Sequence, residues 1–213
     1  MTEFIAARWQ DILFRSYQHT SLVIQSVVLA LIIALVIAIF VAQRPRGAAL
    51  ANALSSIGLT LPSLALLGLA IPLFGIGTVP SVVLVVFYAV LPSLRNAIVG
   101  LHTVDPAVIE SARGQGMSSA AILFRIRLPL AWPIIMTGIR VATQMSMGVA
   151  AIAAYALGPG LGGYIYSGLS QIGGTNALNY TLVGTLGVVV IALIVDAILA
   201  GIQKLTTPKG ISA

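Results

Sequence analysis

The chain has 213 residues, of which 59% are hydrophobic and only 8% are charged. Soluble globular domains carry about 25% charged residues, so this composition excludes a soluble fold and indicates a chain that lies mostly within a lipid bilayer. The net charge of +6 does not indicate nucleic-acid binding, because the eleven lysines and arginines are scattered between apolar segments and form no basic stripe.

Few side chains are available for catalysis or for metal binding. The chain has no cysteine, two histidines and five acidic residues, so disulfides and thiolate metal sites are excluded and no metal or cofactor is expected. A membrane-embedded enzyme would have to use His102, Asp105 and Glu110, and no second histidine or nucleophile accompanies them. We therefore expect no catalytic residue and a protein that is not itself an enzyme.

Residues 1–19 are predicted to form an arm that lies in the membrane interface. Apolar side chains recur on one helical face of this segment, and the charged side chains fall elsewhere. Trp9 and Tyr17 suit the depth of the lipid headgroups, where amphipathic aromatic rings are enriched.

Five apolar segments follow, each long enough to cross a bilayer, which takes about 20 residues. They are residues 21–42, 50–69, 79–101, 130–157 and 182–205. The sequence therefore predicts an all-α membrane protein with five transmembrane helices, which make up a single domain over residues 1–213.

The distribution of basic residues predicts how these helices are oriented. The loops after the first and third segments, together with the C-terminal end, hold Arg44, Arg46, Arg95, Arg113, Arg125, Arg127, Lys204 and Lys209. The opposite side holds only Arg8 and Arg15, which Glu3 and Asp11 nearly balance. The positive-inside rule then puts the N-terminus outside and the C-terminus in the cytoplasm.

Three prolines lie inside or beside the second and third segments. Pro62, Pro72 and Pro92 each remove a backbone hydrogen bond, which in lipid is tolerated only where other helices or a watery cavity satisfy the freed groups. These segments are therefore the candidates to line a pathway across the membrane. The alternative is a set of kinks that serve packing alone.

Residues 102–129, here called the coupling loop, are the one long polar stretch between segments, and they are predicted to be cytoplasmic. Asp105 is a suitable N-cap for a first helix, and Gly116 is suited to the left-handed turn that ends it. Ser118 can cap a second helix, which is predicted to stop before Pro129. Two short helices that meet at a glycine bend would form a compact unit, small enough to enter a cleft on a partner.

The coupling loop also carries a spaced motif. Glu110-Ser111-Ala112 is followed after three residues by Gly116, and after nine more by Ile126-Arg127-Leu128-Pro129. This spacing resembles the EAA loop of the membrane subunits of bacterial ABC importers, E-A-A-x3-G-x9-I-x-L-P, with Ser111 in place of the first alanine. The resemblance implies that the loop docks on an ATP-hydrolysing subunit through Glu110, Ser111, Ala112, Gly116, Ile126, Leu128 and Pro129. A linker with helical propensity is the alternative.

Longer stretches resemble one branch of these importers, the permeases for glycine betaine, carnitine and choline. They are residues 61–68, 71–77, 91–96, 104–106, 138–143 and 158–162. The resemblance implies a prokaryotic cell-membrane permease that works with ABC ATPase subunits, a second permease subunit and an external solute-binding protein. The second permease can be the same chain or a homologue. A permease for another small solute, such as methionine or a sulfonate, stays open, whereas an uncoupled channel or receptor leaves the coupling loop unexplained.

The glycine-rich segment 158–180 is predicted to be a long loop on the outer side. Long loops are often functional, and Tyr164 and Tyr166 in this one suit contact with the binding protein. Tyrosines near a membrane surface also serve as interface anchors, and this alternative stays open.

Two charges of opposite sign lie deep within predicted spans. Arg140 is about 15 Å from the cytoplasmic start of the fourth segment, and Asp196 is about 12 Å from the cytoplasmic end of the fifth. An unpaired charge at such a depth costs at least about 2.5–3.5 kcal/mol, so we expect an intramembrane ion pair. The alternative is that Asp196 attracts a cationic substrate along the pathway.

Overall fold

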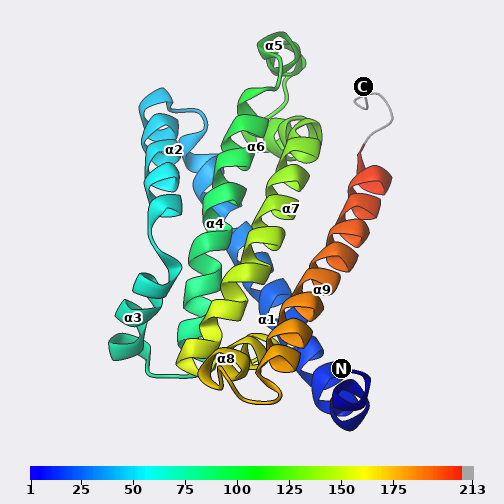
Figure 1. Ribbon diagram of the computed structural model, residues 1–213. Helices are drawn as coiled ribbons and strands as arrows, with labels where there is room; N and C mark the ends of the chain where they lie inside the picture. The colour runs from blue at the N-terminus through cyan, green and yellow to red at the C-terminus, as the bar shows by residue number, and fades with distance from the viewer. Residues whose placement is uncertain (208–213) are drawn as a thin grey trace.

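The computed structural model describes residues 1–207, and every regular element in this range is helical (Figure 1). The elements are α1 (Thr2–Val41), α2 (Pro45–Thr60), α3 (Ser63–Phe74), α4 (Thr78–His102), α5 (Pro106–Gly114), α6 (Ser119–Ile122), a π-helical turn (Leu123–Arg127), α7 (Leu128–Ile152), a 3-10 turn (Ala153–Ala156), α8 (Gly162–Ser170) and α9 (Ala177–Thr206). The predicted all-α class is therefore confirmed for the described residues. Lys209, which the orientation argument counts, lies outside them.

The core of the molecule lies where α1, α4 and α7 pack together. Ala30, Ala34 and Ala38 recur every four residues along α1 and are completely buried, which lets the neighbouring backbones approach closely. Gly100 of α4 serves the same purpose, because a Cβ atom there would lie 3.0 Å from the carbonyl oxygen of Ala131. Small residues thus set the spacing of the three central helices.

Within residues 1–207, four continuous helices are long and apolar enough to cross a membrane, and the bent pair α2 and α3 would add a fifth span. The prediction of one unbroken helix over residues 50–69 is wrong, because α2 and α3 meet at an angle of 94°. The break falls at Leu61, which adopts an extended conformation before Pro62, as residues that precede proline usually do. The Tyr88 hydroxyl donates a hydrogen bond to the Leu61 carbonyl oxygen, so α4 satisfies a group freed by the break.

The predicted arm is not a separate element. Residues 2–19 form the first part of α1, a single helix of 40 residues. At 1.5 Å per residue such a helix is about 60 Å long, twice the thickness of the hydrocarbon core. The first turns of α1 therefore extend beyond the bilayer or run obliquely in it, and they leave Trp9 and Tyr17 exposed.

The second helix of the coupling loop does not stop before Pro129, contrary to the prediction. The chain stays helical from Ser119 to Ala156, with a π-helical turn at its start. In that turn the Leu128 N–H donates to the carbonyl oxygen of Leu123, five residues earlier. Pro129 therefore lies inside a continuous helix, two residues after the π-helical turn, where the hydrogen-bond pattern already departs from that of a regular α-helix.

The two ends of the molecule differ in character. α5 projects alone at one end, whereas α8 lies across the opposite end, next to the first turns of α1 and α9 (Figure 1). Residues 158–180 were predicted to be a long loop, but their middle part is the short helix α8. This helix packs mainly on α9.

Candidate docking loop and intramembrane polar sites

Local hydrogen bonds define both ends of α5 in the coupling loop. The Asp105 carboxylate accepts from the Ala107 N–H at 2.8 Å and so caps the first turn. At the other end, Gly116 has a φ of +81° and its N–H donates to the Arg113 carbonyl oxygen. The Met117 N–H reaches the carbonyl oxygen of Ala112, which completes a Schellman motif. The predicted end of the first helix at Gly116 therefore agrees with the structure.

A small hydrophobic core holds α5 against α6. It consists of Val104, Ile109, Ala112 and Ile122, with Met117, Ile126 and Leu130 packed against it. Ala112 is only 3% exposed, so a larger side chain at this position would push the two helices apart. The Ser118 hydroxyl accepts from the Ala121 N–H at 3.2 Å, so it caps α6 as predicted. The coupling loop is therefore a rigid unit with its own packing.

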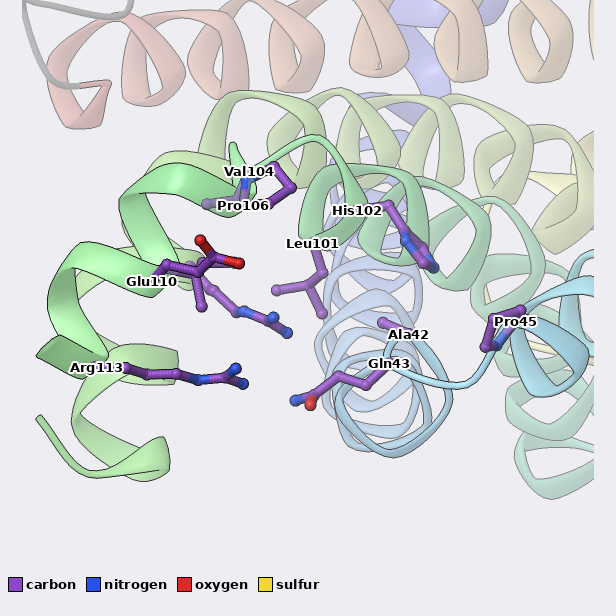
Figure 2. Close-up of a pocket in the computed structure, with 11 residues that line it drawn as sticks. Ala42, Gln43, Pro45, Leu101, His102, Val104, Pro106, Glu110 and Arg113 are labelled. Atoms are coloured by element: carbon purple, nitrogen blue, oxygen red, sulfur yellow. The ribbon is translucent and has the colours of Figure 1, made fainter.

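One side of α5 borders a pocket of about 330 Å³ that also contacts the connection between α1 and α2. Glu110 and Arg113 extend from α5 toward this pocket, with Gln43 on the opposite wall (Figure 2). Among residues 1–207, neither Glu110 nor Arg113 forms an ion pair. Both are exposed, so their charges are available to a partner chain.

The other side of α5 forms a second groove, of about 390 Å³. Its lining consists of Ala107, Val108, Ser111, Ala112, Gln115, Met117 and Ile126. Ser111 is exposed here, whereas Ala112 forms the floor. α5 thus presents charged side chains to one groove and small or apolar side chains to the other, a surface suited to insertion into a complementary cleft.

The motif residues divide into two groups in the structure. Glu110, Ser111 and Gly116 are exposed at the tip, while Leu128 and Pro129 are half-buried in the first turn of α7. The latter two belong to the base of the coupling loop, where Leu128 packs against the main core of the molecule. The pocket residues Gln43 and His102 fall outside the motif. The one feature of the sequence that could have pointed to Gln43 is its position in a polar turn after an apolar span.

Arg140 and Asp196 lie side by side within the membrane-spanning region. The Arg140 Nε and Nη2 atoms donate to the two carboxylate oxygens of Asp196 at 2.9 and 2.8 Å, which is bidentate geometry. Gln203, two turns further along α9, accepts from Arg140 Nη1 at 3.3 Å. Its own amide donates to the Pro133 carbonyl oxygen at 3.1 Å, so the network ties α9 to two turns of α7. Sequence reasoning missed Gln203, although it shares a helical face with Asp196.

The three prolines differ in exposure. Pro62 and Pro72 are exposed on the single chain, whereas Pro92 is buried within the core. Near Pro92, the Asn96 side chain donates to its carbonyl oxygen at 2.9 Å. Pro92 is therefore covered by protein, whereas Pro62 and Pro72 remain exposed on this chain.

Tyr164 and Tyr166 are not equivalent. Tyr166 is 41% exposed, but Tyr164 is only 2% exposed, so the predicted contact of Tyr164 with a binding protein is wrong for this structure. Its hydroxyl donates to Asp11 at 2.7 Å, and the guanidinium of Arg15 lies 5.5 Å from the ring centroid. Burial raises the pKa of the Tyr164 hydroxyl, and the hydrogen bond to Asp11 raises it further. Tyr164 therefore stays protonated, and its hydrogen bond links α8 to α1.

His19 is a buried polar residue for which the sequence predicts no role. Its Nε2 atom lies 3.2 Å from the Met147 carbonyl oxygen of α7. A carbonyl only accepts, so Nε2 carries the proton and links α1 to α7. No group of three or more histidine, cysteine or acidic side chains in residues 1–207 is arranged to hold a metal ion.

Comparisons with known proteins agree with this geometry. Residues 26–207 match the family model described as the binding-protein-dependent transport system inner membrane component. The choline transport system permease protein of Bacillus subtilis is 35% identical over 99% of this chain and 95% of its own length. The glycine betaine/carnitine/choline permease of the same organism is 36% identical, again over 99% and 95%.

Two further comparisons extend this picture. An osmoprotectant import permease of Salmonella typhimurium is 36% identical over 92% of each chain. In an inward-facing structure of the MetNI methionine ABC transporter, one chain superimposes with a TM-score of 0.79 at 20% sequence identity. The superposition covers 92% of this chain and 96% of the other, and at this identity it shows a shared fold.

Proposed function

Because the chain belongs to the family of inner membrane components of binding-protein-dependent transport systems, we propose that it is the permease subunit of an ABC importer for osmoprotectants. It passes glycine betaine, choline, carnitine or a similar quaternary amine from an external binding protein to the cytoplasm. ATP hydrolysis belongs to separate ATPase subunits, and a second permease subunit completes the pathway.

The coupling loop is the observation that carries this proposal. It is a compact unit at one end of the molecule, with a mini-core of its own and with Glu110 and Arg113 unpaired among the described residues. Such a rigid projection transmits movement from a partner, whereas a flexible linker would not. Glu110, Ser111 and Gly116 form the docking surface, and Ala112, Ile126, Leu128 and Pro129 support it.

The proposed topology has five spans, with α2 and α3 together as the second. The coupling loop then faces the cytoplasm together with the end of α9, and α8 lies on the outer side. All of residues 1–213 form one membrane domain in a prokaryotic cell membrane. α5 and α8 lie at opposite ends in Figure 1, and the positive-inside rule supports a cytoplasmic position for the arginine-bearing α5.

The substrate class rests on the relatives that cover nearly the whole chain. Their names specify choline, carnitine and glycine betaine, solutes that share a trimethylammonium group. Methionine is the second candidate, on the basis of the fold shared with the methionine transporter. Identity of 20% supports the fold and not the substrate, so the osmoprotectant class is favoured.

Two further assignments belong to this proposal. Pro62, at the break between α2 and α3, and Pro72, inside α3, line the pathway, because backbone groups freed by proline need water or a partner. Tyr166, exposed on α8, lies on the outer surface that receives the binding protein. The ion pair of Arg140 and Asp196 holds α9 against α7. It does not attract a cationic solute, because the arginine neutralises the charge of the aspartate.

The test is co-purification followed by transport. The tagged chain, expressed with its ATPase, second permease and binding protein, should retain the ATPase in detergent and import labelled choline, glycine betaine or carnitine. Uptake of methionine alone would replace the substrate assignment, and failure to retain any ATPase would remove the importer proposal. The variant Glu110→Lys should be inserted in the membrane normally yet lose both the ATPase and uptake.

A further inference from the structure

The surface exposed by the membrane-spanning helices is not uniform. α1 and α9 expose aliphatic side chains along their central turns, among them Ile32 and Leu193. α7 exposes the smaller and more polar Thr137, Gln144 and Gly148, together with Val141. Polar groups within spans face a bundle interior or a water-filled cavity, because an amide in hydrocarbon has no hydrogen-bond partner. The Gln144 amide therefore favours contact with protein or water over lipid on this side of α7.

This side of α7, here called its polar face, consists of Thr137, Val141, Gln144 and Gly148, and it continues to an exposed tyrosine at its α8 end. Tyr155 follows Gly148 by seven residues and Gln144 by eleven, spacings that keep it on the same side of a helix. Tyr155 lies in the 3-10 turn after α7 and is 49% exposed. The polar face thus ends at an aromatic ring.

A second tyrosine completes an aromatic corner at this place. The ring of Tyr166, from α8, lies with its centroid 5.1 Å from that of Tyr155, and the two ring planes are inclined by 78°. Edge-to-face packing of this kind orients both rings and covers one face of one of them, and both side chains remain more than two-fifths exposed.

The other aromatic cluster at this end of the molecule already contains cations. The guanidinium of Arg8 lies 5.1 Å from the ring centroids of both Phe4 and Tyr180, and Arg15 lies over Tyr164. In the part of the chain that the structure describes, no arginine or lysine lies over Tyr155 or Tyr166. The rings of this pair are therefore open to a cation from outside the chain.

The chemistry of the site fits a quaternary ammonium ion. Such an ion has no N–H to donate, so it is recognised by the negative faces of aromatic rings and not by hydrogen bonds. The nearest intramembrane cation along the polar face, Arg140, is held by both oxygens of Asp196 and carries no uncompensated charge that would repel a second cation.

We propose that Tyr155 and Tyr166 form a binding site for the trimethylammonium group of the solute, at the outer entrance to a pathway along the polar face of α7. This inference rests on the proposed function, which supplies the orientation and the class of solute. The site receives the solute as the docked binding protein releases it, and the rings hold the cation until the pathway opens.

The test uses the complete importer with variants of the two tyrosines. Equilibrium binding of radiolabelled tetramethylammonium is measured on the purified importer without its binding protein, and choline uptake is measured in proteoliposomes with the binding protein and ATP. Tyr155→Phe and Tyr166→Phe keep a ring and should stay within about threefold of the wild type. Tyr155→Leu and Tyr166→Leu should each weaken tetramethylammonium binding about tenfold. Tyr17→Leu, another exposed tyrosine, is the matched control and should bind normally.

Progressive fluorination of a phenylalanine at position 155 separates cation recognition from packing. Fluorine withdraws electron density from the ring face at little cost in shape, so affinity should fall stepwise from mono- to trifluorophenylalanine. Leucine variants that bind tetramethylammonium as the wild type does, or a flat fluorination series, would overturn this site while leaving the importer proposal intact. A wild-type importer that moves none of choline, glycine betaine and carnitine would instead overturn the proposed substrate class.

Discussion

Substitution of Gly116 offers the sharpest test of the coupling loop. This residue has a φ of +81°, a conformation that costs other L-residues about 1–2 kcal/mol and is a severe outlier for a β-branched side chain. No atom outside the local backbone lies within 4 Å of a Cβ placed there, so the whole cost comes from the backbone and none from a clash. Gly116→Val therefore perturbs the bend of the loop alone.

The magnitude follows from that backbone cost. A penalty of about 1–2 kcal/mol against the bent conformation should reduce the affinity for the ATPase subunit roughly 5- to 30-fold. Gly116→Ala should fall in the lower half of this range, and Gly116→Asn should lose least, because asparagine tolerates the left-handed region. Affinity is measured by titrating the purified ATPase onto the detergent-solubilised permease, and uptake is measured in parallel.

Gly114 is the matched control for this series. It lies two residues earlier in the last turn of α5, it does not have a positive φ, and a Cβ placed there also has no neighbour within 4 Å. Gly114→Val should therefore bind the ATPase within about threefold of the wild type. Equal losses in Gly114→Val and Gly116→Val, or wild-type docking by Gly116→Val, would refute the argument that the left-handed bend positions the docking surface.

Three other changes test the packing around these sites. Arg140→Asp and Asp196→Arg should each destabilise the permease by at least about 2.5–3.5 kcal/mol, which would be seen as lost assembly in detergent. The double exchange should restore part of the assembly, and no restoration at all would contradict the pairing. Tyr164→Phe removes the hydrogen bond to α1 and should cost about 1–3 kcal/mol in thermal unfolding while import continues, whereas an unchanged melting temperature would show that the bond contributes nothing. Gly158→Ala would place a methyl group 2.7 Å from the Ala153 carbonyl oxygen and should lower the melting temperature by the equivalent of about 1–3 kcal/mol. An unchanged melting temperature would show that the turn can move to accommodate the methyl group.

Features that depend on neighbouring residues were accessible from the sequence. The cap at Asp105, the left-handed turn at Gly116 and the cap at Ser118 follow from local backbone chemistry, and all three are present in the structure. The approach of Arg140 to Asp196 was also accessible, because charges inside a bilayer are so costly that two of opposite sign at one depth are expected to meet.

Features that depend on distant segments were not accessible from the sequence. The helix break at Leu61 is stabilised by Tyr88 of α4, and no local pattern indicates which hydroxyl will reach that carbonyl group. The continuity of the helix through Leu123–Arg127 depends on a π-helical turn, which local rules for proline do not anticipate.

The two tyrosines of α8 illustrate the same division. Tyr164 and Tyr166 are nearly equivalent in sequence, yet one is buried against Asp11 and the other is exposed beside Tyr155. The sequence by itself determined that this chain lies in a membrane and that its polar loop has two capped helical turns around a glycine bend, because composition and spacing act through solvation and local geometry. The tertiary structure alone decided which polar and aromatic groups are covered, because burial depends on partners that lie far apart along the chain.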